Sequence, residues 1–293
     1  MKPKVERKEL AAMIHLLDDS DVEVYNHVFE KLTNLGLEII PELENAWSDT
    51  YDNTMQERLE ELIHKIQFQS LYKDFEVYAQ EGKFDLLTGA VLIARFAYPD
   101  LKMELIQEEL MKIKREVWLE FNYNLTPLEQ ISILNQVFFT NLGFDVSNPN
   151  EINEGDFFIN KTLESKNGHP VLIGLIYCLV ARKVDLPIYG LNLPNHFALV
   201  FCKNEIDFSQ GVEDLRKDVI FYMNPHSKGT IFTKNEIEDY LSKIESEPKP
   251  AYFSPCSDKR VIKLVLKSLM TYYLEKNDEI RTKELSLLIG LVL

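Results

Sequence analysis

The sequence predicts an α+β protein, because helical periodicity dominates the chain while strand-like segments are confined to residues 188–232. Apolar residues recur at helical spacing through the first 70 residues. Residues 170–181 form an apolar run that is too long for a typical strand and ends in Arg182 and Lys183, cations suited to a helix C-terminus. The short strand-like segments after it are separated by prolines and turns. We therefore expect a central buried helix against a small antiparallel sheet.

The first 70 residues have the pattern of short amphipathic helices in pairs. Apolar residues follow helical spacing at 10–17, 25–32 and 59–66. The Asp18-Asp19-Ser20-Asp21 segment offers N-cap side chains before the second helix, and Gly36 is suited to end it. The Ile40-Pro41-Glu42-Leu43 segment after that glycine resembles the opening of a HEAT repeat. Such pairs stack and present a surface. Two interpretations stay open here: a module that binds a partner, and a helical cap on the next domain.

Residues 71–140 are also predicted to be helical. Residues 84–98 are apolar on nearly every face, which indicates a buried helix, and Pro99 ends it. Thr126 and Glu129 form a capping box around Pro127, which predicts that a helix begins there. Residues 141–153 are polar and rich in turn formers, so we expect a surface loop.

The order of elements after residue 168 is the most informative part of the chain. The predicted helix opens at Pro170, and strands are predicted at 188–193, 196–201, 219–224 and 230–232. A second capping box at Thr233 to Glu236 predicts another helix. Residues 246–255 read as a linker, and two further helices follow with a joint at Asn277 and Asp278.

Several short motifs in this region carry a family resemblance. They are residues 158–164, Gly168-His169-Pro170, Leu193-Pro194-Asn195-His196-Phe197 and residues 224–229. In this order they resemble the SirB-type branch of the transglutaminase-like superfamily, over about two thirds of the chain. The resemblance implies a papain-like core with a cysteine nucleophile at the start of the central helix, a histidine on a neighbouring strand and an Asp or Asn that orients the histidine.

This chain departs from the family pattern at the nucleophile. The resemblance places the cysteine position at Pro170, the histidine at His196 and the orienting residue at Asn224. Such a cysteine is activated by the helix N-terminus and by the histidine, which takes its proton. Because proline has no nucleophilic side chain, the resemblance implies a scaffold without its nucleophile.

No other cysteine is expected to take this role. Cys178 is eight residues beyond Pro170, about 12 Å along a helix, and lies on an apolar face. Cys202 would be about 20 Å from His196 on an extended strand, and Cys256 has no neighbouring histidine in the sequence. Asp207 is a rival partner for His196, although a carboxylate at a strand end is more often part of a turn.

Composition limits the partners and cofactors. The 293 residues carry a formal net charge of −15, a field that repels nucleic acid and anionic lipid surfaces. The sequence shows no signal segment and no run long enough to span a membrane, so we expect a cytoplasmic protein with neither nucleic acid nor membrane as partner. His15, His27 and His64 are too far apart for a metal site, and no cofactor motif is present, so neither is expected.

The predicted organisation is a HEAT-like region at residues 1–70, a transglutaminase-like domain at 71–246 and a helix pair, similar to the start of a tetratricopeptide-like array, at 247–293. The leading functional hypothesis is a catalytically degenerate protein whose cleft or helical surface binds a peptide or protein. Two alternatives remain: an enzyme of non-thiol mechanism that uses His196 and Asn224, and a structural adaptor that acts through its HEAT-like helices. The sequence does not indicate the oligomeric state.

Overall fold

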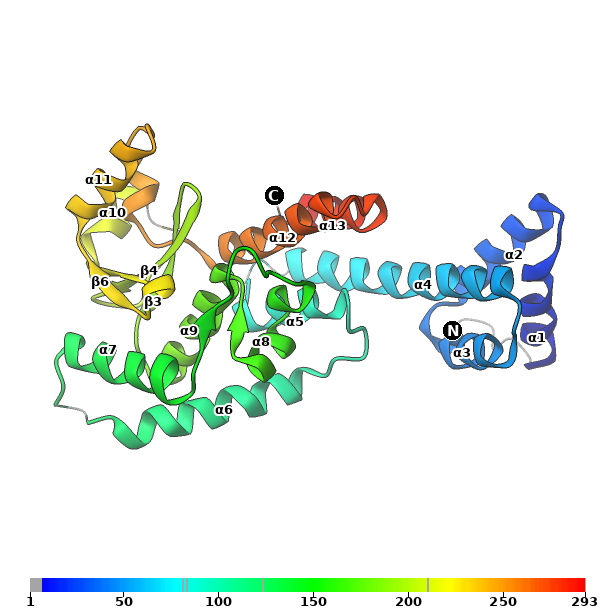
Figure 1. The fold of residues 1–293 in the computed structure, drawn as a ribbon, viewed down its shortest axis with the longest axis horizontal. Coiled ribbons are helices and arrows are strands. Elements are labelled where there is room, and N and C mark those ends of the chain that lie inside the picture. Colours follow the sequence, from blue (N-terminus) through cyan, green and yellow to red (C-terminus); the bar gives the residue numbers. More distant parts are fainter. Residues whose placement is uncertain (1–6, 81, 83, 123, 210, 293) are drawn as a thin grey trace. The chain divides into compact units, whose positions relative to one another are not determined.

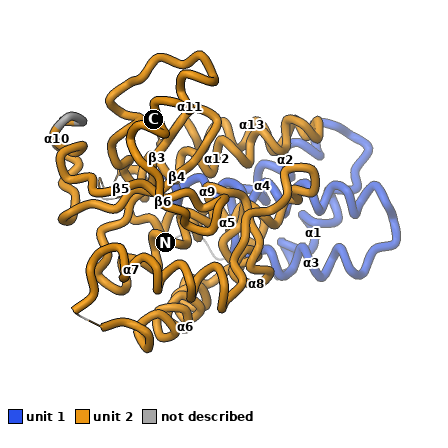
Figure 2. Tube along the Cα trace, turned by 60° about the vertical axis from the view of Figure 1, so that its left-hand side comes forward, with its two compact units in different colours: residues 1–77 blue, residues 78–293 orange. Residues whose placement is uncertain are grey.

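The computed structural model describes the chain except for residues 1–6, 81, 83, 123, 210 and 293, and it divides into two compact units, residues 1–77 and 78–293 (Figure 2). The described strands all belong to the second unit (Figure 1). Mostly helical structure with one small antiparallel sheet is what the sequence predicts. Among the described residues, no helix has both the length and the apolar content to cross a membrane.

The first unit contains α1 (Arg7–His15), α2 (Val22–Leu35), α3 (Ile40–Asp49) and most of α4 (Asn53–Gln80). The Asp21 side chain accepts a hydrogen bond from the Glu23 N–H at the start of α2, and Gly36 ends this helix at a positive φ of 81°. Both caps lie where the sequence predicts them. Apolar residues at the predicted spacings form the core of this unit, among them Leu17, Leu32, Leu59 and Leu62. The predicted boundary between residues 70 and 71 lies within α4.

Helices also form much of the second unit. The predicted buried helix is α5 (Leu86–Arg95), capped by the Asp85 side chain, and α6 (Met103–Glu120) follows it. The capping box of Thr126 and Glu129 begins α7 (Pro127–Asn135) as predicted, and a π-helical segment, η3 (Gln136–Asn141), continues it.

The predicted strands form a four-stranded antiparallel sheet in the order β3-β4-β5-β6. They are β3 (Ile188–Leu193), β4 (His196–Cys202), β5 (Val219–Asn224) and β6 (Thr230–Phe232). β3 and β4 are joined by a turn in which Asn195 has a positive φ of 55°, so that Leu193 pairs with His196. A short helix, α10 (Val212–Lys217), lies between β4 and β5 in the sequence.

The central helix is α9 (Pro170–Lys183), and it is buried from Val171 to Ala181. It packs against β3 and β4 of the sheet and against α6 and α12 (Figure 1). Gly174 permits this contact, because a Cβ there would lie 2.4 Å from the Phe197 ring. The prediction of a central buried helix that begins at Pro170 is therefore confirmed.

The sequence prediction missed one pair of short strands. Residues 141–153 are predicted as a loop, but β1 (Asp145–Val146) pairs in parallel with β2 (Asn167–Gly168). The backbone N–H groups of Asp145 and Ser147 donate to the carbonyls of Lys166 and Gly168. A two-residue strand carries no periodicity, so the sequence pattern cannot reveal it.

The remaining elements frame the sheet and α9. Short 3₁₀ turns occur at η1 (Leu16–Asp18), η2 (Leu37–Ile39), η4 (Glu154–Phe157), η5 (Pro225–Ser227) and η6 (Pro250–Phe253). The helices α8 (Ile159–Ser165), α11 (Lys234–Lys243), α12 (Asp258–Glu275) and α13 (Glu279–Leu291) complete the unit. α12 packs on α5 and α9, so the C-terminal helices belong to the same compact unit as the sheet.

Candidate functional site

The backbone N–H groups in the first turn of α9 are hydrogen-bonded to the preceding residue, His169. The His169 ring caps the helix, because its Nδ1 accepts a hydrogen bond of 3.3 Å from the Val171 N–H. The His169 carbonyl accepts hydrogen bonds from the N–H groups of Leu172, at 2.8 Å, and Ile173, at 3.0 Å. Pro170 has no N–H. The N–H groups of the first turn are thus already bonded within the chain.

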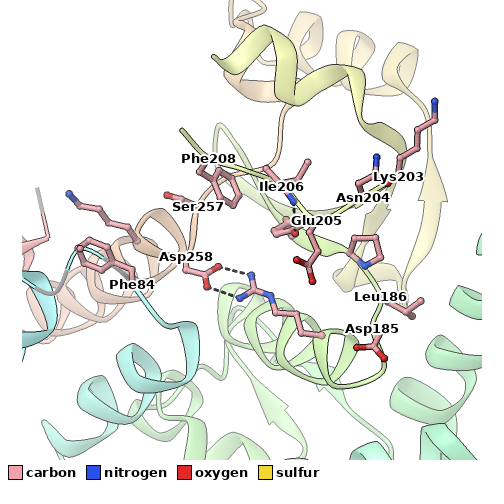
Figure 3. Close-up of a pocket in the computed structure, with 15 residues that line it drawn as sticks. Phe84, Asp185, Leu186, Lys203, Asn204, Glu205, Ile206, Phe208, Ser257 and Asp258 are labelled. Atoms are coloured by element: carbon pink, nitrogen blue, oxygen red, sulfur yellow. Dashed lines mark hydrogen bonds and ion pairs between the residues drawn. The ribbon is translucent and has the colours of Figure 1, made fainter. Parts of the chain in front are cut away.

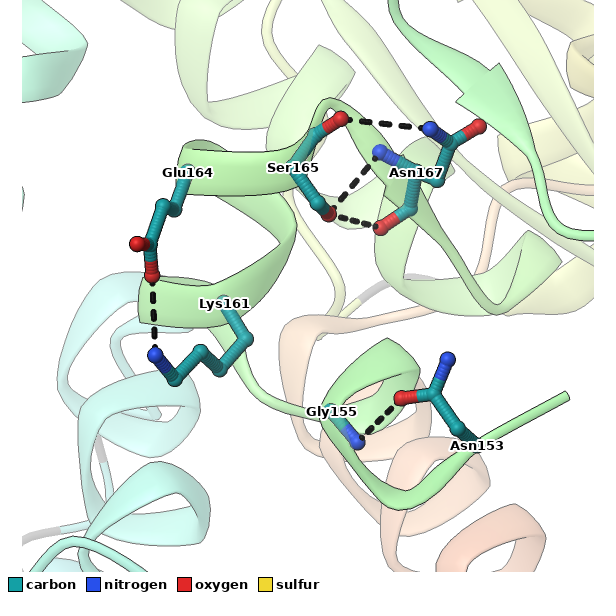
Figure 4. Close-up of polar contacts among 6 residues, drawn as sticks. All are labelled: Asn153, Gly155, Lys161, Glu164, Ser165 and Asn167. Atoms are coloured by element: carbon teal, nitrogen blue, oxygen red, sulfur yellow. Dashed lines mark hydrogen bonds and ion pairs between the residues drawn. The ribbon is translucent and has the colours of Figure 1, made fainter.

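The segment before α9 is held by local polar contacts, among them those of Asn153 with Gly155 and of Ser165 with Asn167 (Figure 4). Asn153 caps the turn at Gly155, and Lys161 pairs with Glu164 on α8 at 2.9 Å. The His169 N–H donates to the Asp156 carbonyl at 2.8 Å. Gly168 lies so close to α8 that a Cβ would be 2.6 Å from Thr162, so packing requires a glycine at this position.

His196 and Asn224 lie at adjacent strand ends. His196 begins β4 and Asn224 ends β5, and the Asn224 side chain lies close enough to His196 to raise its pKa slightly, against the larger effect of burial. The Asn224 Oδ1 also accepts a hydrogen bond of 3.0 Å from the His226 N–H. The rings of His196 and His226 stack with their centroids 4.9 Å apart.

These groups surround a small cavity of about 290 Å³, which we call the histidine cleft. Pro170 and His196 both line this cavity. Asn224 is not among the lining residues and lies beside His196. The structure therefore brings the three residues named by the sequence to one end of α9, and their functional role stays a prediction. The cleft is lined by His169, Pro170, Val171, Asn192, Leu193, Asn195, His196, Phe197, His226, Leu264 and Ser268.

The environment keeps the three histidines uncharged at neutral pH. Burial, with a smaller contribution from the neighbouring His226, lowers the pKa of His169 from 6.5 to about 4. Loss of solvent also lowers the pKa of His196, against a smaller opposing effect of the Asn224 side chain. For His226, partial burial and the charge of His196 lower the pKa.

His169 and His226 are site residues that were not predicted from the sequence. Both residues lie inside the motifs that carry the resemblance, one directly before Pro170 and the other two residues after Asn224. Their proximity to predicted site residues was a usable signal. A capping role for His169 is harder to predict, because histidine is not a preferred N-cap residue.

The cysteines lie outside the histidine cleft. Cys178 and Cys202 are buried and Cys256 is partly buried; burial raises the pKa of each thiol to about 12. None of the three lines the cleft. Asp207 accepts a hydrogen bond of 3.0 Å from the Ser209 N–H, as a carboxylate in a turn does.

A larger cavity, of about 760 Å³, lies at the C-terminal end of α9 (Figure 3). Arg182 and Asp258 form a two-pronged ion pair there, with both hydrogen bonds at 2.6 Å. Neither histidine nor cysteine is among its lining residues, so it contains no pairing of a thiol with a base. Within the described residues, no group of three or more His, Cys, Asp or Glu could hold a metal ion.

The low pKa of His169 predicts a specific loss of stability in acid. Because its pKa is about 6.5 in the unfolded chain and about 4 in the folded protein, the unfolded state binds more protons between these values. The contribution of His169 to the free energy of unfolding is fully present above pH 6.5. It is lost as pH falls towards 4, by about 3 kcal/mol in total. His169→Asn retains a capping side chain but does not titrate.

We expect His169→Asn to match the wild type in urea unfolding at pH 7 and to lose less stability on acidification. His27→Asn, at an exposed position on α2, is the matched control and should follow the wild-type pH profile. Equal acid sensitivity of His169→Asn and the wild type would show that His169 does not become charged on unfolding.

A family model matches more than half of the chain and thereby shows the family to which it belongs. Residues 104–267, which include α9, the sheet and the histidine cleft, match the family model described as the transglutaminase-like superfamily. The chain belongs to the transglutaminase-like superfamily. No solved structure matches it.

Curated relatives of this transglutaminase-like chain match only in part. A UPF0162 protein of Xylella fastidiosa is 29% identical over 116 residues, which are 38% of this chain and 40% of the relative. The F-box only protein 21 of Mus musculus is 26% identical over 143 residues, 48% of this chain and 21% of the relative. A UPF0162 protein of Vibrio cholerae is 22% identical over 115 residues, 39% of this chain and 43% of the relative. The chain thus spans less than half the length of each of these relatives.

Proposed function

We propose that this protein is a catalytically degenerate member of the transglutaminase-like superfamily whose histidine cleft binds a peptide or a protein segment. The observation that carries the proposal is Pro170 at the first position of α9, where the family resemblance places the nucleophilic cysteine. A proline there supplies neither a thiol nor an N–H. The scaffold around it nevertheless keeps His196 and Asn224 at adjacent strand ends, which supports the proposal of a degenerate site.

Two features of the cleft support binding. Its lining combines apolar side chains, such as Leu193 and Leu264, with polar groups, such as Asn192 and Ser268. Ligand sites typically have this mixture, in which apolar contact supplies affinity and a few polar groups set orientation. Asn195 and His226 remain exposed, so the cleft is open to a segment from outside.

Within the family, we further propose the SirB-type branch, on the basis of the Gly168-His169-Pro170 motif and residues 193–197. For the first unit we propose a HEAT-like arrangement, supported by paired helices and by Pro41 in the first turn of α3. Its helical surface would then be a second place for protein contacts.

One observation favours a second candidate, an enzyme of non-thiol mechanism. Burial lowers the pKa of His196 and so favours its neutral ring, which could accept a proton from a water molecule that attacks a bound acyl group. That reaction would be insensitive to thiol reagents and would be abolished in His196→Ala.

A random peptide library displayed on phage tests the proposed function. Peptides selected on the wild type should bind it in solution and should lose affinity for Ser268→Phe, which fills the cleft from α12. Thr271→Phe adds the same ring at an exposed position of α12 outside the cleft lining and is the matched control. Selected peptides that bind all three proteins equally would contradict binding in the cleft.

A further inference from the structure

The lining of the histidine cleft contains no acidic side chain, although the whole chain has a net charge of −15. Its polar members are three histidines, two asparagines and a serine. Each of these can donate a hydrogen bond, and the histidines can in addition gain a positive charge. We propose that the cleft recognises a carboxylate group, presented by an acidic peptide. This inference rests on the proposed function and specifies the ligand of the same site.

The hydrogen bonds within the cleft leave histidine donors for such a group. Because the Nδ1 of His169 accepts from the Val171 N–H, its proton in the neutral ring is carried by Nε2. The His226 backbone N–H is bonded to Asn224, but no described hydrogen bond engages the His226 ring. That ring keeps contact with solvent and with the cleft. The donors are imidazole groups, since the N–H groups of the first turn of α9 are already bonded.

The other titratable groups around the histidines do not compete for them. The Asp156 carboxylate accepts a hydrogen bond of 2.8 Å from the Asn153 N–H. The Tyr240 hydroxyl donates to the Pro194 carbonyl at 2.6 Å, and its ring packs near His196. On α12, Tyr272 packs against Phe157, which in turn stacks on His169. No carboxylate is among the groups that perturb the three histidines, so a carboxylate from a ligand would meet no resident anion.

Three cations on α12 are neighbours in the sequence of the two cleft residues of this helix. Arg260, Lys263 and Lys267 flank Leu264 and Ser268, the two residues that α12 contributes to the cleft. Desolvation and then repulsion from neighbouring cations, Lys267 first among them, lower the pKa of Lys263. The cations are thus close enough to act together. They favour a peptide that carries further acidic residues beside the bound carboxylate.

A bound carboxylate would reverse the effect of the cleft on its histidines. In the free protein, burial lowers the pKa of His196, and burial together with repulsion from His196 lowers the pKa of His226. A nearby anion favours the charged imidazolium and raises both values. Proton uptake then accompanies binding, so affinity should rise as pH falls from neutral through and below 6.5, by up to about tenfold per pH unit for each proton taken up.

Three small probes test this inference by histidine NMR. They are N-acetyl-dialanine as the free acid, its amide, and N-acetyl-aspartic acid amide. The free acid should raise the pKa of His226 and His196, and the neutral amide should leave both unchanged. If the aspartic amide acts and the free acid does not, the carboxylate comes from a side chain; the reverse result indicates a chain terminus, and either result supports the inference.

His226→Asn keeps a hydrogen-bond donor without a charge, so it should weaken the pH dependence of probe binding, while His27→Asn should leave it unchanged. The same comparison with acidic and uncharged peptides from the phage selection separates this inference from the proposed function. Equal affinity of both peptide classes, lost in Ser268→Phe, would overturn carboxylate recognition and leave peptide binding in place. Peptide binding that is insensitive to Ser268→Phe would overturn both.

Discussion

Pro170→Cys should create a thiol with a pKa below the roughly 8.5 of a free cysteine. The substitution is tolerated because position 170 is the first of α9 and a restored N–H there needs no intrahelical partner. The new thiol would lie at the positive end of the helix dipole and in the same cleft as His196. The native cysteines, with pKa values of about 12, provide little background reactivity.

Iodoacetamide reaction rates as a function of pH measure this pKa directly. In the Pro170→Cys background, His196→Ala should raise the value, because the imidazole that accepts the thiol proton is lost. Ser268→Cys places a thiol in the same cleft but on α12, away from the helix N-terminus, and is expected to titrate near the free value. If the thiol pKa of Pro170→Cys equals that of Ser268→Cys and does not change when His196→Ala is added, the cleft no longer retains a catalytic arrangement.

Gly229→Ala is expected to produce the largest loss of stability. Gly229 has a φ of 75°, and an added Cβ would lie 2.1 Å from Oδ1 of Asn135. Asn135 cannot move freely, because its amide donates to the Gly229 carbonyl at 3.1 Å and its Oδ1 accepts from the buried Tyr177 hydroxyl at 2.8 Å. Backbone strain and the broken hydrogen bonds should together cost about 3 kcal/mol or more.

Gly143→Ala is the matched control in urea unfolding. Gly143 has nearly the same φ, 74°, but nothing lies within 4 Å of an added Cβ. It should therefore lose only the strain of about 1 to 2 kcal/mol. Equal destabilisation of the two variants would mean that the bonds of Asn135 contribute nothing to the stability of the turn after β5.

Local signals in the sequence predict most of the elements that build the site. The capping box at Thr126, the apolar run after Pro170 and the strand composition around Pro194 each indicate one element. The structure has those elements beginning at the predicted residues, Pro127, Pro170 and His196. These signals depend on neighbours in the chain, and for this reason a single sequence carries them.

The cleft itself depends on contacts that the sequence does not display. His226 reaches His196 only because β4 and β5 pair, and Ser268 lines the cleft only because α12 packs across α9. Asn135 is 94 residues from Gly229 in the chain. Such long-range contacts follow from tertiary packing, so no local pattern could predict that three histidines surround Pro170.

Thiol alkylation measured together with peptide affinity tests the central claim most directly. Wild-type protein is treated with iodoacetamide, the modified residues are mapped by mass spectrometry, and affinity for the phage-selected peptides is compared before and after treatment. A degenerate site predicts unchanged affinity and no thiol-dependent turnover of the peptides. The claim would be contradicted by peptide cleavage or acyl transfer that depends on a native thiol. Such an activity would be lost as Cys178, Cys202 or Cys256 is modified, and it would be absent in the matching Cys→Ser variant.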